Sequence, residues 1–129
     1  MWHMHFDGSC SNEGNKYGII FCSPVGKIHN FSYRIEFSCT NNVNEFEALL
    51  LGIENSYNLG CGNLTVFGDC ELVVNLVRKI YSPTNKLMKS YTQKFWALIS
   101  NLLSFNITHV KGELNSMADK LVFFVVSPT

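Results

Sequence analysis

The sequence lacks any apolar run long enough to span a membrane, and no basic segment precedes an apolar one at its N-terminus. We therefore expect neither a transmembrane helix nor a signal peptide. The five cysteines are odd in number and scattered, and they include no C-x-x-C pair. This spacing argues against a disulfide framework and a cysteine zinc site. It favours reduced thiols in an intracellular protein, either cytoplasmic or nuclear.

Acidic residues are absent from residues 72 to 112, although the whole chain has ten acids and ten bases. The bases of this segment are Arg78, Lys79, Lys86, Lys89, Lys94 and Lys111. The segment therefore has a formal charge of +6, and the remaining four bases and ten acids give −6. An acidic site beside a basic region suits a metal-dependent enzyme that acts on a polyanion. The alternative is a solvated helix face that bears lysines and binds nothing.

The chain does contain a regular succession of strand and helix patterns. Its 129 residues suit a single domain that spans residues 1–129. Alternating or short apolar runs predict strands over residues 2–6, 17–22, 27–37, 64–67 and 105–110. Periodicity of 3.6 predicts helices over residues 43–59, 70–79 and 86–103, and a last helix near residue 115.

The connections between these elements predict how the sheet is built. The first three strands are joined by short links, which favour an antiparallel meander. Helical crossovers precede the fourth and fifth strands, so these can lie parallel to the first. The fold class is therefore α/β, with a five-stranded mixed sheet of three antiparallel strands and two further parallel strands, flanked by helices.

Four acids are expected to meet at one end of this sheet. Asp7 ends the first strand, and Glu45 lies in the first turn of the helix over residues 43–59. Asp69 follows the fourth strand and is predicted to be the N-cap of the next helix. Asp119 is one helical turn after Asn115. The spacing alone is weak support, because many sets of four surface acids could be arranged in this way.

Such a cluster has a chemical use. Like charges held together cost stability, and divalent cations relieve the repulsion. Ligands that are all oxygen favour Mg²⁺ or Mn²⁺ over zinc. Two such ions about 4 Å apart can activate a water and stabilise the leaving oxygen in phosphodiester cleavage.

Four sequence blocks closely resemble the type 1 ribonuclease H family. They are FDGSC at residues 6–10, TNNVNEFEAL at 40–49, FGD at 67–69 and HVKGELNSMAD at 109–119. The likeness covers nearly the whole chain, and it is greatest to plant ribonuclease H-like domains, including those attached to gypsy-type LTR retrotransposon reverse transcriptases. The resemblance implies a ribonuclease H-like fold. It also implies an endonuclease that cuts the RNA strand of RNA–DNA hybrids with Mg²⁺ as cofactor, for which Mn²⁺ can substitute.

The same resemblance assigns roles to individual residues. The catalytic carboxylates, which are also the metal ligands, match Asp7, Glu45, Asp69 and Asp119. Residues matched to the minor groove of the hybrid, near the RNA 2′-hydroxyls, are Gly8, Ser9, Asn12, Asn41 and Asn42. Thr40 matches a residue that holds a phosphate of the DNA strand. From their position beside the Leu87–Tyr91–Phe95 stripe, Lys86 and Lys89 are predicted to contact the DNA backbone.

Departures from the family pattern keep a second hypothesis open. Glu71 replaces a polar residue that usually touches the hybrid, and an acid there would repel phosphate. Residues 111–114 leave little room for the mobile histidine loop of cellular members, so His109 is predicted to be a structural strand residue. The alternative function is a non-catalytic or weakly active tether or hybrid-binding domain of a reverse-transcriptase polyprotein. The expected partners are an RNA–DNA hybrid and a covalently attached reverse transcriptase domain, without a membrane.

Overall fold

The structure is a computed structural model that describes residues 1–11, 14–35 and 40–111. The elements within these ranges follow in the predicted order. Their bounds are β1 Trp2–Ser11, β2 Gly14–Cys22, β3 Ile28–Ile35, α1 Asn41–Asn58, β4 Asn63–Gly68, α2 Glu71–Val77, α3 Lys86–Ile99 and β5 Ser104–His109. Asn12, Asp119 and the helix predicted near residue 115 lie outside the described residues.

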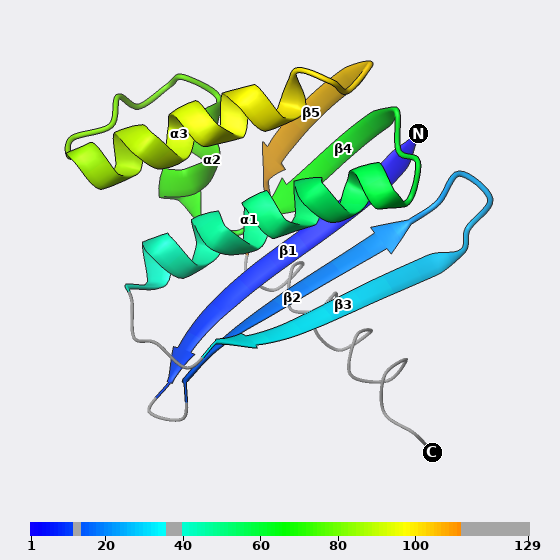
Figure 1. The fold of residues 1–129 in the computed structure, drawn as a ribbon, viewed down its shortest axis with the longest axis horizontal. Helices are drawn as coiled ribbons and strands as arrows, with labels where there is room; N and C mark the ends of the chain where they lie inside the picture. The colour runs from blue at the N-terminus through cyan, green and yellow to red at the C-terminus, as the bar shows by residue number, and fades with distance from the viewer. Residues whose placement is uncertain (12–13, 36–39, 112–129) are drawn as a thin grey trace.

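The five strands form one mixed sheet in the order β3-β2-β1-β4-β5. Strands β1, β2 and β3 pair antiparallel, whereas β4 pairs parallel with both β1 and β5 (Figure 1). This arrangement confirms the predicted α/β fold class. It also places the carboxyl ends of β1 and β4 at the same end of the sheet, where open α/β sheets hold their ligands.

Strand β1 is longer than its sequence pattern indicates. The pattern predicts a strand over residues 2–6 that Asp7 ends, but β1 continues to Ser11 and pairs with β2 as far as Gly14. Its parallel pairing with β4 ends earlier, at Phe6 opposite Gly68. Asp7 therefore does not end the strand. It lies just beyond the last parallel pair, where only the antiparallel partner continues.

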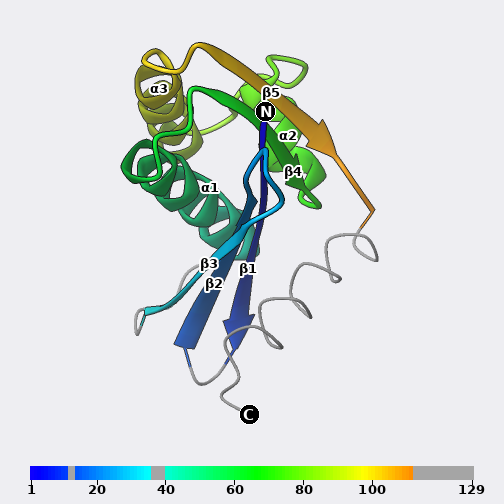
Figure 2. The same ribbon diagram turned by 90° about the vertical axis from the view of Figure 1, so that its right-hand side faces the viewer.

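Helices α1 and α3 lie side by side over one face of the sheet (Figures 1 and 2). The core between helices and sheet is apolar and fully buried, and it includes Met4, Phe6, Ile19, Phe21, Phe46, Leu49, Ile53, Leu64, Val66 and Phe95. The apolar side chains that α1 buries, Phe46, Leu49 and Ile53, recur with the helical period from which this helix was predicted. The phase predicted for α3 is wrong at its first turn, because Leu87 is 51% exposed and Met88 is buried instead.

Helix α3 ends at Ile99, four residues before the predicted end at 103. A turn follows, in which the backbone N–H of Leu102 donates to the carbonyl of Ile99. Among the described residues, no helix has the length and hydropathy that a membrane-spanning helix needs.

Candidate active site

The structure brings three of the four predicted acids together. One carboxylate oxygen from each of Asp7, Glu45 and Asp69 lies within 4.8 Å of the others. Asp7 comes from β1, Asp69 directly follows β4, and Glu45 projects from α1. Because α1 begins two residues earlier than predicted, Glu45 lies in its second turn rather than its first. The predicted convergence is therefore confirmed for these three residues.

Glu45 is held by the backbone of β1. Its side chain is only 6% exposed, and its Oε1 accepts a hydrogen bond of 2.9 Å from the backbone N–H of Gly8. Gly8 also permits the close approach of α1, because a Cβ there would lie 2.9 Å from the carbonyl carbon and oxygen of Asn44. Gly8, expected only as a substrate contact, thus also has a structural function in this site.

Asp69 does not cap α2. The N-cap position belongs to Cys70, which makes no side-chain capping hydrogen bond. The N-cap predicted at Asp69 is therefore one residue early, and a carboxylate oxygen of Asp69 lies within 4.8 Å of one from each of Asp7 and Glu45. A sequence pattern cannot distinguish these two uses of an aspartate at a strand-to-helix junction.

Cys70 connects the start of α2 with the start of α1. Its thiol donates to the Asn42 Oδ1 at 3.4 Å. Burial raises the pKa of this thiol, and the negative charges of Glu45 and Asp69 raise the pKa further, against the lowering effect of nearby backbone N–H groups. The thiol therefore keeps the proton that it donates. The sequence does not predict this contact, because a single cysteine after a strand has no fixed partner.

The end of β5 supports the backbone at Asp69. The backbone N–H of Val110 donates to the Gly68 carbonyl at 2.9 Å, and the His109 Nε2 lies 3.2 Å from the Asp69 carbonyl oxygen. His109 lies opposite Gly68 on β5, as a strand residue, and its side chain is exposed. Its contact with Asp69 follows from the β4–β5 register, which the sequence alone does not fix.

The other predicted substrate contacts lie at helix starts and on β1. Thr40 is the N-cap of α1, and its side chain accepts from the backbone N–H of Val43 at 3.3 Å. Asn41 and Asn42 begin α1, and Ser9 lies on β1. These residues are close in sequence or pairing to the acids, so their backbone positions fit the predicted surface.

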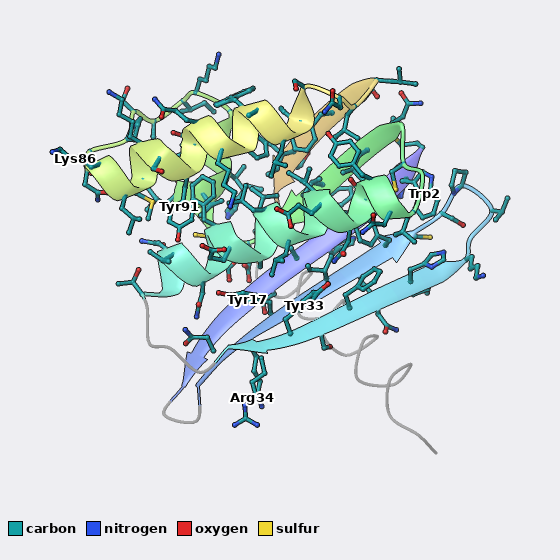
Figure 3. All side chains as sticks on the ribbon, viewed as in Figure 1. Trp2, Tyr17, Tyr33, Arg34, Lys86 and Tyr91 are labelled. Atoms are coloured by element: carbon teal, nitrogen blue, oxygen red, sulfur yellow. The ribbon has the colours of Figure 1, made fainter. Side chains whose placement is uncertain are left out.

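Lys86 and Lys89 lie in the first turns of α3, and both side chains are exposed. Figure 3 shows Lys86 at the end of the molecule where α1 also begins, with Tyr91 between α3 and α1. The lysines belong to a helix that packs on α1, and α1 carries Glu45. They do not join the acidic cluster itself.

This sheet, with acids just beyond the last parallel pair of its central strands β1 and β4, defines a ribonuclease H fold with an acidic site. The family model described as "Reverse transcriptase-like" matches residues 5–125, and the chain belongs to this family. Comparison with curated protein sequences gives no match.

Solved structures agree with the fold. The ribonuclease H1 of the halophilic archaeon Halobacterium salinarum NRC-1 superposes with a TM-score of 0.85 at 24% identity, covering 93% of this chain and 92% of that one. LC11-RNase H1 in complex with an RNA/DNA hybrid gives 0.82 at 22% identity, covering 98% and 100%. The foamy viral protease-reverse transcriptase in complex with dsDNA gives 0.65 at 16% identity, covering 93% and 88%.

Proposed function

We propose that this chain is a metal-dependent endonuclease that hydrolyses the RNA strand of RNA–DNA hybrids. The observation that carries the proposal is the convergence of Asp7, Glu45 and Asp69 within 4.8 Å at one end of the sheet. A set of like charges this close costs stability, and packing gives no reason for it. The membership of the reverse transcriptase-like family and the hybrid bound by LC11-RNase H1 support the substrate.

The donor set fits Mg²⁺ or Mn²⁺, because its ligand atoms are carboxylate oxygens. Asp7, Glu45 and Asp69 would hold the metal, with Asp119 as the fourth carboxylate. When bound, two such ions supply an activated water and stabilise charge on the leaving oxygen of a phosphodiester. The chain contributes a fixed geometry: the Gly8 N–H orients one oxygen of Glu45, and burial prevents this side chain from rotating into solvent.

We propose that the hybrid binds to the surface around Asp7, Glu45 and Asp69. We propose that the minor groove is contacted by Gly8, Ser9, Asn12, Asn41 and Asn42, with Thr40 at a DNA phosphate. Lys86 and Lys89 extend the contact along the DNA backbone. A covalently attached reverse transcriptase domain is the proposed partner, supported by the family and by the foamy viral protein.

The test is incubation with an end-labelled RNA–DNA hybrid, single-stranded RNA and duplex RNA, each with Mg²⁺, with Mn²⁺ and with EDTA. We expect cleavage of the RNA strand of the hybrid with either metal and none with EDTA. Equal cutting in EDTA, or a folded protein that cuts nothing with either metal, would contradict the proposal. Duplex RNA cleavage would widen the substrate class without changing the site.

A second candidate is a hybrid-binding tether with little or no catalysis. Glu71 favours it, because this carboxylate is exposed two residues after Asp69 and would repel the phosphates of a substrate. Binding of the hybrid with a measurable Kd, together with no cleavage at any Mg²⁺ or Mn²⁺ concentration, would establish the tether in place of the nuclease.

A further inference from the structure

Glu71 makes a contact that the proposed function does not use. It is the first residue of α2, and its Oε1 accepts a hydrogen bond of 3.0 Å from the Tyr81 hydroxyl. Tyr81 lies in the link between α2 and α3 and is 41% exposed. The pair is therefore at the surface, where a side-chain contact of this kind is not needed to satisfy buried groups.

The link after α2 folds back along the helix, which allows this contact to form. Lys79 adopts a positive φ of 64°, and the backbone N–H groups of Ile80 and Tyr81 both donate to the Asn75 carbonyl, at 2.9 and 3.0 Å. A positive φ is uncommon for a residue with a side chain. This turn brings the backbone of Tyr81 back beside Asn75, and from there its hydroxyl reaches Glu71 at the start of the helix.

Glu71 lies close in the chain to the acidic site and to a predicted hybrid contact. The preceding residue, Cys70, contacts Asn42, which is proposed to bind the hybrid. Asp69, before that, is one of the three clustered acids. A nucleic-acid strand that contacts Asn42 therefore passes close to Glu71, and a mobile carboxylate there would repel its phosphates. Tyr81 restrains that carboxylate.

We propose that Tyr81 is a positioning residue that holds Glu71 away from the hybrid backbone, so that this pair sets the affinity of the site for a polyanionic substrate. The inference rests on the proposed function, because it requires a hybrid at the acidic site. Asp7, Glu45 and Asp69 would then be the charges that bind metal, whereas the charge of Glu71 only weakens substrate binding. The pair also accounts for how a chain with an acid at position 71 retains a hybrid-binding surface.

The experiment compares the native protein with Glu71→Gln, Tyr81→Phe and the double variant. The Kd for a fluorescent RNA–DNA hybrid is measured by anisotropy in EDTA, and KM and kcat are measured in Mg²⁺. Glutamine removes the charge but keeps an oxygen that can accept from Tyr81, whereas phenylalanine frees the carboxylate. Matched controls are Glu54→Gln, which removes an exposed acid from α1, and Tyr33→Phe, which removes a hydroxyl bonded to Asn55.

We expect Glu71→Gln to lower Kd and KM and Tyr81→Phe to raise them, each about two- to fivefold, the range typical of exposed charges. The effect should appear in KM rather than in kcat. In the double variant Tyr81→Phe should have no further effect, because the charge that it releases is gone. The two controls should leave Kd unchanged.

Two results would overturn the inference while leaving the proposed function intact. One is an unchanged Kd in all three variants of a protein that still cleaves the hybrid. The other is a Tyr81→Phe loss of affinity that persists in the double variant, which would show a structural or direct role for Tyr81. A protein that binds the hybrid without cutting it would still test the pair, through Kd alone. If the native protein binds no hybrid, the proposed function and the inference fail together.

Discussion

Glu45 is the buried member of the acidic cluster, whereas Asp7 and Asp69 are only partly buried. A carboxylate that is 94% removed from solvent loses most of its hydration, and the Gly8 N–H restores only part of it. Two more acids lie within 4.8 Å, so electrostatic repulsion is added to desolvation. Proteins keep such an arrangement when a bound cation or a reaction depends on it, because a neutral side chain would be more stable there.

The first prediction concerns Asp69→Asn. Cys70 and not Asp69 is the N-cap residue of α2, and asparagine keeps a side-chain oxygen at position 69, so the start of the helix should be preserved. The change does remove one charge from the cluster, so the melting temperature in EDTA should be equal to or higher than that of the native protein. Metal binding should weaken, and hybrid cleavage in Mg²⁺ should fall by orders of magnitude. A clear drop in melting temperature, or nearly normal cleavage, would show that Asp69 is a structural acid.

The second prediction concerns Gly8→Ala. The new Cβ would lie 2.9 Å from the Asn44 backbone, which cannot move without shifting α1. The shift would stretch the bond that holds Glu45, so cleavage should fall severely. Urea denaturation should show a loss of about 1–3 kcal/mol in the free energy of unfolding, as is typical of overpacking.

Gly62→Ala is the matched control for this glycine. Its Cβ would meet only the Leu103 side chain, with Cδ1 at 3.1 Å and Cγ at 3.6 Å, and that side chain is exposed and can rotate away. The control should therefore keep both stability and cleavage. If Gly8→Ala behaves like Gly62→Ala, the close approach of β1 and α1 is not required by the site.

At the scale of elements, the sequence predicted the type and order of every described element, and the errors lie at their ends. The extension of β1 to Ser11 comes from pairing with a distant β2, which local turn residues such as Gly8 do not reveal. In α3, Leu87 and Met88 are both apolar, so periodicity alone does not choose which of them faces the core. Long-range packing decides both cases.

The candidate site was also predictable only where local sequence and topology determine it, and not where long-range packing does. Asp7 and Asp69 could be placed together because each follows a predicted strand and the two strands are parallel; in the structure both acids follow the last parallel pair, Phe6 opposite Gly68. The contacts of Cys70 with Asn42 and of His109 with Asp69 depend on side-chain direction and on register, and neither has a sequence signature. Sequence therefore predicted that Asp7, Glu45 and Asp69 lie together, but not the contacts made by the residues beside them.

The third prediction tests the contact between α1 and α3. The Tyr91 hydroxyl donates to the Glu47 Oε1 at 2.6 Å, and its ring stacks on Phe46 with centroids 5.4 Å apart. Tyr91→Phe removes the hydrogen bond and keeps the ring, so the free energy of unfolding should fall by about 1 kcal/mol. Cleavage at a temperature well below the melting point should be unchanged, because Glu45 is fixed by β1. A large loss of kcat would show that α3 also positions the acidic site.

At the scale of the whole molecule, the basic segment and the clustered acids belong to different helices and strands. The segment of formal charge +6 contains α3, β5 and all of α2 except its first residue, Glu71, whereas the clustered acids belong to β1, α1 and the end of β4. Helix α3 lies beside α1, which carries Glu45 (Figure 2). A polyanion that enters the acidic site can therefore be held by basic side chains of a neighbouring element, and these offset the repulsion of the acids.

The fourth prediction tests this arrangement with Lys86→Ala combined with Lys89→Ala. Both side chains are exposed at the start of α3, so their removal should cost little stability. Each lysine that neutralises a phosphate releases counterions, so the slope of log K against log salt should become shallower by about one unit per lysine. Lys27→Ala, in the turn between β2 and β3, is the control and should leave the slope unchanged. An unchanged slope in the double variant would mean that α3 presents a solvated face, and that the hybrid is held by the surface around the acids alone.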